Sequence, residues 1–481
     1  MLPITIFSLF LQRGFKSLAW LGLIIFTASL MWLVRANSYF LDDDYDHFIQ
    51  AAQLPLAQLL AMPIDVHYAP LHKLLSALIQ YLAPLDFDAA LLVMLVFHGL
   101  AMLLLYKLLQ ALSDSPVNLL IVLLYGCNPF LLHPLMWWSS GIHRFPYIFL
   151  CLASLYAYLR FHQSRRPGHL ACCYLAFFLA FGFYSKAILI PLYILGLEFC
   201  LSARHGMRRL LLGCVPGVAM LLISLGYAWW YLNFAPLMQD AAAPSILLTG
   251  KIVLLNFQIL AGVLSFNQYG APLGLNLLLA ALLLAGIFYS LWKNRWVLPI
   301  WLVLFGCVAI NFAMLASSGR GQMYGELLAL VLRYYFEVMF LIAIFGGLLL
   351  AVLRGAPEPG VRPVHWIALV LCLVYVSALG WVGRPHFFSL YGSFHVAANH
   401  YMQRLIGSLD RLPSDRTLSL AAANLPLYVY GQFINTPMPM ERVLPLRYPH
   451  LVMVPRAEAD YEVDETGALL PLSVKPGQSE P

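Results

Sequence analysis

Long apolar runs, separated by short polar stretches, make up most of this chain. Many reach roughly 16 residues or more, close to the length an α-helix needs to cross a bilayer, and they do not alternate as barrel strands do. The pattern therefore predicts an all-α polytopic membrane protein with about eleven transmembrane helices. The predicted spans are 17–35, 90–110, 117–136, 145–161, 169–184, 187–202, 210–232, 272–291, 296–315, 328–351 and 364–382.

Two of these runs have features of their own. The first, Ser17–Val34, follows Arg13 and Lys16 and lacks a small-x-small exit, so we interpret it as a retained signal anchor rather than a cleaved signal peptide. The fifth and sixth spans are short and could form one broken pair around Gly182 and Lys186.

Basic residues indicate the orientation of the chain, because cytoplasmic loops are enriched in lysine and arginine. They predict a cytoplasmic N-terminus and a C-terminal region on the outer side, provided that 251–268 does not cross. We expect that segment to be an interfacial or re-entrant helix on the outer side. The cytoplasmic group is Arg13, Lys16, Lys107, Arg160, Arg165, Arg166, Arg204, Arg208, Arg209, Lys293, Arg295, Arg354 and Arg362.

Two regions are too long to be simple connectors, and both are expected on the outer side. The first outer loop, 37–88, contains Asp46–Ala61 and Leu71–Leu82, which have helical periodicity but are too short to span, so they predict helices lying in the interface. Residues 1–382 thus form the transmembrane domain with this loop inserted in it.

The C-terminal region, 383–481, is expected to be a small α/β segment. An amphipathic helix is predicted at His395–Leu412, and the last ~15 residues are polar and expected to be disordered. Short β-like runs are Thr417–Ala423, Leu427–Tyr430 and Leu451–Val454.

Composition narrows the functional classes. The chain is 62% hydrophobic and only 10% charged, so each acidic residue stands out. All eight cysteines fall inside apolar segments, which favours small buried side chains over disulfides or a CxxC metal site. The net charge of +6 is dispersed among loops and gives no nucleic-acid signal.

Three consecutive carboxylates, Asp42, Asp43 and Asp44, follow the first span, with Tyr45 next. Adjacent like charges disfavour full ionisation unless a cation or a proton transfer makes use of them. The cluster is either a solvated patch that caps the following helix, or a general base or metal-binding pair at the membrane surface.

Other polar residues are expected on the same face. His67, Tyr68, His72 and Lys73 form either a turn before an interfacial helix or a set of contacts to a substrate. A turn from Asn128 to Arg144 is also expected on the outer side, and in it Trp137 and Trp138 suit an aromatic belt. His133 and Arg144, also in that turn, are expected near the aspartates.

Two cations lie at the ends of later spans. Lys186 either snorkels to the interface or binds an anion. Arg333, followed by Tyr334, either pairs with Glu337 at helical i,i+4 spacing or faces a cavity and binds an anion. A base and phosphate-binding cations on one face suit a lipid-phosphate sugar donor, whose tail stays in the bilayer.

In this order the motifs resemble the GT-C superfamily of membrane glycosyltransferases, especially the protein O-mannosyltransferase-like branches. The resemblance covers roughly residues 15 to 350, and Ala69 departs from it where a basic residue is often found. The elements that carry it are the acidic pair, Tyr68-Ala69-Pro70-Leu71, Asn128-Pro129 with His133-Pro134, Trp137 and Arg144, Ser185-Lys186 with Pro191, and Arg333-Tyr334.

The resemblance implies an enzyme of the bacterial inner membrane that transfers a sugar from a polyprenyl-phosphate donor to a lipid or lipopolysaccharide, a polysaccharide or a protein. It implies Asp43 as base, with Asp44 or Asp42 beside it. Some branches are metal-independent and others are not, so a divalent metal ion on Asp43 and Asp44 stays open. The implied donor-phosphate ligands are Arg333, Lys186, Arg144 and Lys73. The implied substrate contacts are Tyr45, His67, Tyr68, His72, His133, Trp137 and Tyr334.

Two other functions fit the sequence less well. A transporter or flippase of a lipid-linked saccharide is expected to show internal repeats and charges near the bilayer midplane. We find no repeat, and most candidate residues sit at span ends, which favours the enzyme. An O-antigen ligase or polymerase is expected to centre on a large late outer loop with arginine and histidine. Here the large loop comes first and is acidic.

Overall fold

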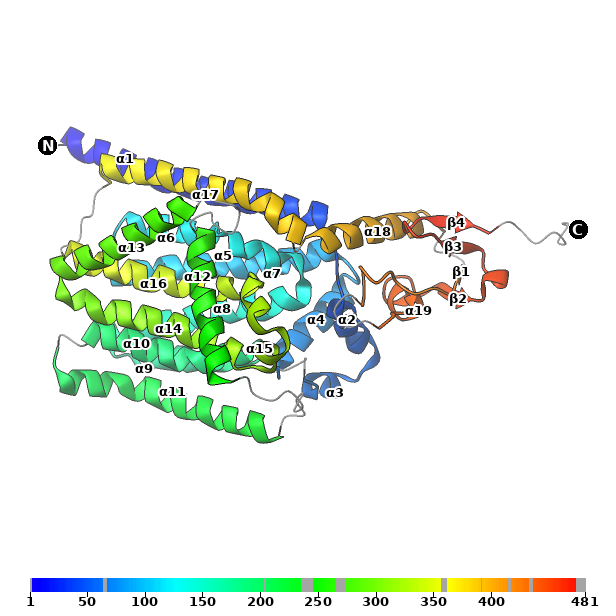
Figure 1. The fold of residues 1–481 in the computed structure, drawn as a ribbon, viewed down its shortest axis with the longest axis horizontal. Coiled ribbons are helices and arrows are strands. Elements are labelled where there is room, and N and C mark those ends of the chain that lie inside the picture. The colour runs from blue at the N-terminus through cyan, green and yellow to red at the C-terminus, as the bar shows by residue number, and fades with distance from the viewer. Residues whose placement is uncertain are drawn as a thin grey trace, which may run out of the picture.

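Helices form most of this computed structural model, and the majority of them run side by side in one bundle (Figure 1). It describes residues 2–63, 67–202, 205–234, 245–264, 273–355, 361–390, 392–413, 417–431 and 436–472. Within these ranges, 10 helices are long and apolar enough to cross a membrane. The chain is therefore a helical polytopic membrane protein, as its apolar runs predict.

The helices of the bundle and its loops are α1 (Leu2–Asn37), α2 (Asp43–Gln53), α3 (Leu56–Ala61), α4 (Pro70–Leu82), α5 (Phe87–Leu112), α6 (Val117–Gly126), η1 (Pro129–Leu131), α7 (Leu132–Met136), α8 (Trp138–Ser164), α9 (Pro167–Phe181), η2 (Ser185–Leu189), α10 (Ile190–Ser202), α11 (Met207–Phe234), α12 (Ile246–Leu264), α13 (Leu273–Lys293), η4 (Arg295–Val297), α14 (Leu298–Ala316), α15 (Gly319–Tyr324), η5 (Gly325–Leu330), α16 (Arg333–Arg354) and α17 (Pro363–Leu390). The C-terminal elements are α18 (Ser393–Leu409), β1 (Leu418–Ala421), α19 (Met440–Val443), η6 (Leu444–Leu446), β2 (Leu451–Val454), η7 (Arg456–Glu458), β3 (Tyr461–Val463) and β4 (Leu469–Pro471).

Polar and proline-containing sequence explains where the helices break. The third predicted span divides at Asn128-Pro129, where the Asn128 carboxamide accepts a hydrogen bond from the Phe130 amide at 3.1 Å. The fifth and sixth spans form a broken pair, as expected, because α9 ends at Phe181 and a 3₁₀ turn carries Lys186.

Several predicted helix boundaries differ from those of the structure. α8 begins at Trp138 rather than at 145, and α16 begins at Arg333 rather than at 328. α17 continues to Leu390, so the predicted domain boundary at 382 falls inside a helix. α8 starts earlier than predicted because Ser139, Ser140 and Arg144 lower the hydropathy of its first turns, whereas the apolar residues 328–330, counted in the tenth predicted span, belong to the 3₁₀ turn η5.

The segment predicted at 251–268 lies in α12, and its last four residues fall outside the described part of the chain. This helix is long and apolar enough to span. Figure 1 shows α12 running across the direction of α14 and α16, unlike its neighbours in the bundle. Its interfacial placement stays a prediction.

One end of the bundle carries the first loop and the C-terminal elements together, while the N-terminus lies at the opposite end (Figure 1). In the loop, two helices (α2 and α3) separated at Pro55 replace the predicted Asp46–Ala61 helix. α4 is tied to the bundle because the Leu71 and His72 amides donate to the Gly182 carbonyl at 2.8 and 3.2 Å.

The C-terminal strands form one four-stranded sheet in the order β2-β1-β3-β4. β1 pairs in parallel with β2, in the register Leu418↔Leu451, and also in parallel with β3, whereas β3 and β4 are antiparallel. The predicted run Leu427–Tyr430 is a turn instead of a strand. Residues 473–481, part of the tail expected to be disordered, lie outside the described residues.

α8 is the central helix of the bundle. It packs against α5 and α9, and 83% of its most apolar 18-residue stretch is buried. Gly141 permits the close approach at its N-terminal end, because a Cβ there would lie 2.4 Å from the Pro134 carbonyl oxygen and 2.1 Å from the Met94 sulfur. The start of α8 thus sits deep between the loop helices and the bundle.

Candidate active site

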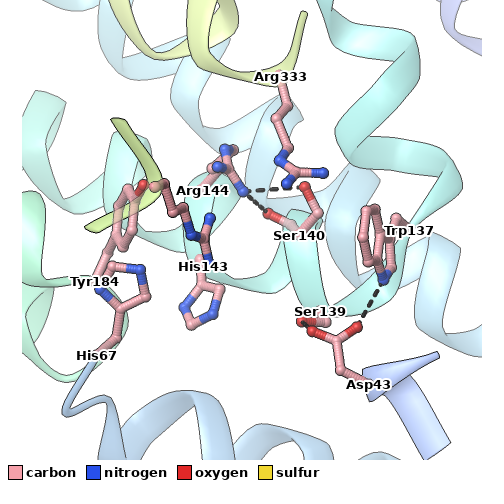
Figure 2. Close-up of a pocket in the computed structure, with 10 residues that line it drawn as sticks. Asp43, His67, Trp137, Ser139, Ser140, His143, Arg144, Tyr184 and Arg333 are labelled. Carbon is pink, nitrogen blue, oxygen red and sulfur yellow. Dashed lines mark hydrogen bonds between the residues drawn. The ribbon is translucent and has the colours of Figure 1, made fainter. Parts of the chain in front are cut away.

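Asp43, the first residue of α2, reaches the start of α8. Its Oδ1 accepts a hydrogen bond from the Trp137 indole at 2.9 Å, and its Oδ2 accepts one from the Ser139 hydroxyl at 2.7 Å. Figure 2 shows the carboxylate held between these two side chains. These two hydrogen bonds orient the carboxylate, and Asp43 as a whole residue is partly exposed.

The two neighbouring carboxylates have different surroundings. Asp44 is fully buried, and its oxygens accept from the Ser139 amide at 2.7 Å and the Leu41 amide at 2.9 Å. Asp42 is also buried, and its Oδ1 accepts from the Gly431 amide at 2.7 Å. Of the three aspartates, Asp43 is the one that lines the pocket described next.

A polar pocket opens between the first loop, the start of α8 and the region from α15 to α16. It encloses about 450 Å³, part of it open to solvent. Its lining is polar or aromatic throughout the described residues, which is unusual for a cavity at the end of apolar helices. The lining residues are Asp43, His67, Trp137, Ser139, Ser140, His143, Arg144, Tyr184, Arg320 and Arg333 (Figure 2).

Burial raises the pKa of Asp43, whereas the donors Ser139 and Trp137 and the charge of Arg333 act to lower it. The pKa of Asp44 is raised well above its usual range, first by burial and then by the charge of Asp43. The pocket thus holds a carboxylate of raised basicity, as a general base needs.

Arg333 faces Asp43 across the pocket in Figure 2. Its guanidinium lies 4.8 Å from the centre of the Trp137 ring, and Trp137 itself donates to Asp43. Of the two alternatives for Arg333, the geometry favours the cavity, because Arg333 lines the pocket while Glu337 pairs with Arg144 and Lys186. Arg333 therefore supplies positive charge to the pocket.

Glu337 is fully buried behind the pocket and joins three elements. Its Oε1 lies 2.6 Å from Nε of Arg144 on α8, and it also forms an ion pair with Lys186 on η2. The Tyr184 hydroxyl donates to it at 3.1 Å. Two cations, Arg144 and Lys186, therefore share the single carboxylate of Glu337. The three side chains together keep a net positive charge next to the pocket.

Arg320 and Tyr334 extend this positive region. The Arg320 guanidinium donates to the Tyr334 hydroxyl at 2.8 Å. The Tyr334 ring lies 5.4 Å from the guanidinium carbons of Arg144 and Arg333 and 5.7 Å from the Lys186 ammonium. An anion is the ligand that such a cluster favours.

Four histidines form a continuous array beside the pocket. His67 and His143 line it, with ring centres 5.3 Å apart, and His143 donates from Nδ1 to the Phe183 carbonyl at 2.9 Å. His72 stacks on His143 at 4.4 Å, and His47 of α2 lies 4.7 Å from His72. Burial holds the pKa of His47, His67 and His72 well below the usual range, so these rings are neutral.

Nine of the predicted site residues do not line the pocket, and Asp42 and Asp44 are two of them. Lys186 and Tyr334 lie directly behind it, and His72 stacks behind His143. Each of the others makes contacts that give it a place in the fold. Tyr45 is fully buried in the core, Tyr68 packs on Trp230 at 5.8 Å, Lys73 donates to the Gln50 carboxamide, and His133 Nε2 is 3.5 Å from Arg333.

Sequence reasoning did not place Ser139, Ser140 or Tyr184 in the site. The first two belong to the start of α8, which hydropathy assigned to a loop. A pair of serines directly after two tryptophans, at the polar start of a span, was the available signal. Tyr184 precedes the broken segment around Lys186 and gave no separate signal.

Hydrogen bonds, and no group of metal ligands among the described residues, hold the carboxylates of Asp43 and Asp44. Each of the four carboxylate oxygens of Asp43 and Asp44 accepts a hydrogen bond from the protein. Within the described ranges, there is also no group of three or more histidine, cysteine, aspartate or glutamate side chains arranged to hold one.

Comparisons with known proteins add no family to this picture. No protein-family model matches the sequence, and a search of the curated proteins finds no match. Fold and site together define a class, a polytopic helical membrane protein with a charged pocket at one end of its bundle. Any narrower assignment depends on the chemistry of that pocket.

Proposed function

We propose that the protein is a GT-C-type membrane glycosyltransferase that moves a sugar from a polyprenyl-phosphate donor to an acceptor hydroxyl on the outer face of a bacterial inner membrane. One observation carries the proposal. Asp43 and Arg333, 290 positions apart by their numbers, line the same pocket at the end of an apolar bundle. Lys186, the third residue expected there, supports it from behind through Glu337.

The residues divide the reaction between them. Asp43 takes the proton from the acceptor hydroxyl while that oxygen bonds to the anomeric carbon of the sugar. The bond from that carbon to the phosphate oxygen breaks, and the polyprenyl phosphate leaves with the electron pair. Arg333, Arg320 and Arg144 stabilise the charge that grows on the phosphate. Asp43 then releases its proton to water.

The pocket's position suits this donor. It lies at one end of the bundle, where a polyprenyl chain stays among apolar helices while its phosphate reaches the cations. The acceptor is a lipid or lipopolysaccharide, a polysaccharide or a protein, and membrane lipids surround the bundle. The inverting outcome is what the resemblance to GT-C enzymes implies.

Transfer by the purified protein tests the base. The protein is reconstituted in liposomes with a panel of radiolabelled polyprenyl-phosphate hexoses and pentoses, and an envelope extract serves as acceptor. Asp43→Asn lowers turnover by roughly 100-fold or more, the range of a lost general base, with an unchanged unfolding temperature. Asp88→Asn, which alters an exposed ion pair with Arg35, leaves turnover unchanged.

Binding of undecaprenyl phosphate tests the cations, with undecaprenol as the probe that lacks the phosphate. Arg333→Ala weakens binding of the phosphate form about 10-fold, because a charge-assisted contact is lost, and leaves undecaprenol binding as it was. Arg456→Ala, in an exposed pair with Glu462, is the control. Full transfer activity in the Asp43→Asn variant would reject Asp43 as the general base. Movement of an intact lipid-linked saccharide across the bilayer would favour a transporter.

A further inference from the structure

Asp42, the residue directly before Asp43, has a backbone conformation that residues with a side chain seldom adopt. Its φ is 45° and its ψ is −116°, in a region occupied mainly by glycine. Asp42 is also 1% exposed. Such a conformation persists only where the surrounding structure imposes it.

Hydrogen bonds from the C-terminal region impose this conformation on Asp42. The Asp42 amide donates to the Val429 carbonyl at 3.1 Å, and the Gly431 amide donates to Oδ1 of Asp42 at 2.7 Å. One turn further along α2, the Tyr430 hydroxyl donates to Oδ2 of Asp46 at 2.8 Å. Three consecutive residues of one turn thus hold the first turn of α2 from outside the bundle.

That turn is built firmly into the C-terminal region. The Leu425 amide donates to the Met438 carbonyl at 2.8 Å, and the Met440 amide donates to the Ala423 carbonyl at 2.9 Å. Gly431 has a φ of 111°, and a Cβ there would lie 3.0 Å from the Thr436 carbonyl oxygen, so the turn requires glycine. The turn is therefore a fixed support.

We propose that Asp42 and the turn 427–431 are positioning elements of the transfer reaction, which set the direction in which Asp43 enters the pocket. The inference rests on the proposed function, because it assigns Asp43 the part of the base. The backbone angles of Asp42 determine where the next side chain points. Released from Val429 and Gly431, Asp42 relaxes to an ordinary conformation and carries the Asp43 carboxylate away from Trp137 and Ser139.

A simpler hypothesis is that these contacts only dock the C-terminal region and have no effect on Asp43. Variants of Asp42 distinguish docking from positioning. Asp42→Asn keeps an oxygen acceptor for the Gly431 amide. Asp42→Ala removes the acceptor but leaves the unfavourable φ. Asp42→Gly removes both the acceptor and the backbone strain, so its unfolding temperature stays close to that of wild type.

Positioning predicts that Asp42→Ala lowers kcat about 10-fold or more, because a small misplacement of a reacting group has a large effect on rate. Asp42→Gly fits the φ of 45° without strain and still donates its amide to Val429, so it keeps more of the wild-type kcat than Asp42→Ala. The KM for the polyprenyl-phosphate sugar changes less than about 3-fold, since the cations are untouched. Asp42→Asn keeps at least half of the wild-type kcat. An Asn variant as slow as the Ala variant, or an Ala variant with full turnover, overturns the proposal.

Hydrogen exchange of the 38–48 peptide gives a readout that does not depend on transfer. Amides of this peptide exchange about 10-fold faster in Asp42→Ala, while Asp42→Asn and the control Asp88→Asn keep the wild-type rate. Unchanged exchange in Asp42→Ala rejects the positioning role even if the enzyme is active. If wild type transfers no sugar, the proposed function fails on its own, and the exchange result still decides whether this turn holds Asp42.

Discussion

Three adjacent carboxylates acquire three different tasks because their surroundings differ. Asp42 bonds to the Gly431 amide, Asp44 accepts from the amide at the start of α8, and Asp43 alone of the three lines the pocket. Asp43 and Asp44 lie at the N-terminal start of α8, where the positive end of the helix dipole stabilises negative charge. Ser139 is the residue that both of them share, through its hydroxyl and its amide.

Ser139→Ala tests how the base is tuned. We expect kcat/KM to fall about 10-fold, because the loss of a hydrogen bond to a charged group weakens the orientation of Asp43. The hydroxyl favours the ionised carboxylate, so its removal raises the pKa of Asp43 further. The acid limb of the plot of kcat/KM against pH therefore moves to higher pH.

The contact of Asp44 survives this change, since it uses the backbone amide of residue 139. Ser164→Ala, at the far end of the same helix, is the matched control and leaves the profile in place. An acid limb that stays where it is, at full turnover, removes Ser139 from the set of residues that tune the base.

At the scale of elements, Glu337 connects α16 to α8 and η2. Its two ion pairs are at most 6% exposed on either side, so they are shielded from water. Such pairs add little stability relative to apolar packing, but removing one partner leaves the others buried and uncompensated. The pocket's wall depends on this carboxylate being charged.

We expect Glu337→Gln to lower the free energy of unfolding by about 3–5 kcal/mol, the usual cost of breaking a buried pair. The measurement is unfolding of the purified protein in detergent by heat or denaturant. Glu326→Gln breaks a pair with Lys251 whose side chains are 49% and 62% exposed, and should cost less than about 1 kcal/mol. Equal costs for the two variants would show that the buried pair has no special weight.

The sequence predicted the elements better than the site. Apolar runs locate most bundle helices, because crossing a membrane depends on length and hydropathy. Hydropathy did not predict the start of α8, because Ser139, Ser140 and Arg144 lower the mean hydropathy there. These three residues are nevertheless buried, and Arg144 donates to the Ser140 carbonyl. The ion pair between Lys186 and Glu337 could not be predicted from the sequence, because it depends on how α16 packs against η2 and not on spacing along the chain.

At the scale of the molecule, the histidine array connects the first loop to the bundle. His47 and His72 belong to loop helices, whereas His143 belongs to α8. Lys73 is the cation that faces His47 and His72 in the loop, and Arg144, Lys186 and Arg320 are the cations that act on His67. Protonating these rings places positive charge in a region that is already positive.

Stability should therefore fall in mild acid. The pKa of His47, His67 and His72 is depressed in the folded state, so only the unfolded chain takes up their protons near pH 6.5. Their contribution is complete above pH 6.5 and is lost as the pH falls below it, by at most about 1.4 kcal/mol per pH unit for each ring. Unfolding temperatures measured from pH 8 to pH 5 check this.

Asp43 and Asp44 act in the opposite direction, because their raised pKa means that the folded state binds protons more tightly. A comparison of variants isolates the histidines. His47→Phe combined with His72→Phe should give a flatter decline between pH 7 and pH 5 than wild type. His400→Gln, at an exposed position, should keep the wild-type slope. A double variant that declines as steeply as wild type contradicts the assignment.

The arrangement of the whole molecule predicts which parts face each side of the membrane. The first loop and the C-terminal sheet lie at one end, opposite the N-terminus (Figure 1). Asp43 and His67 of that loop line the pocket, so one labelling experiment reports on all three. In a cysteine-free background, exposed Gln53→Cys and Glu458→Cys should react with an impermeant maleimide in intact cells. Exposed Gln163→Cys, at the other end of α8, should react only after the membrane is opened. Labelling of Gln163→Cys alone in intact cells would place the pocket in the cytoplasm, where its donor would have to be a cytoplasmic one.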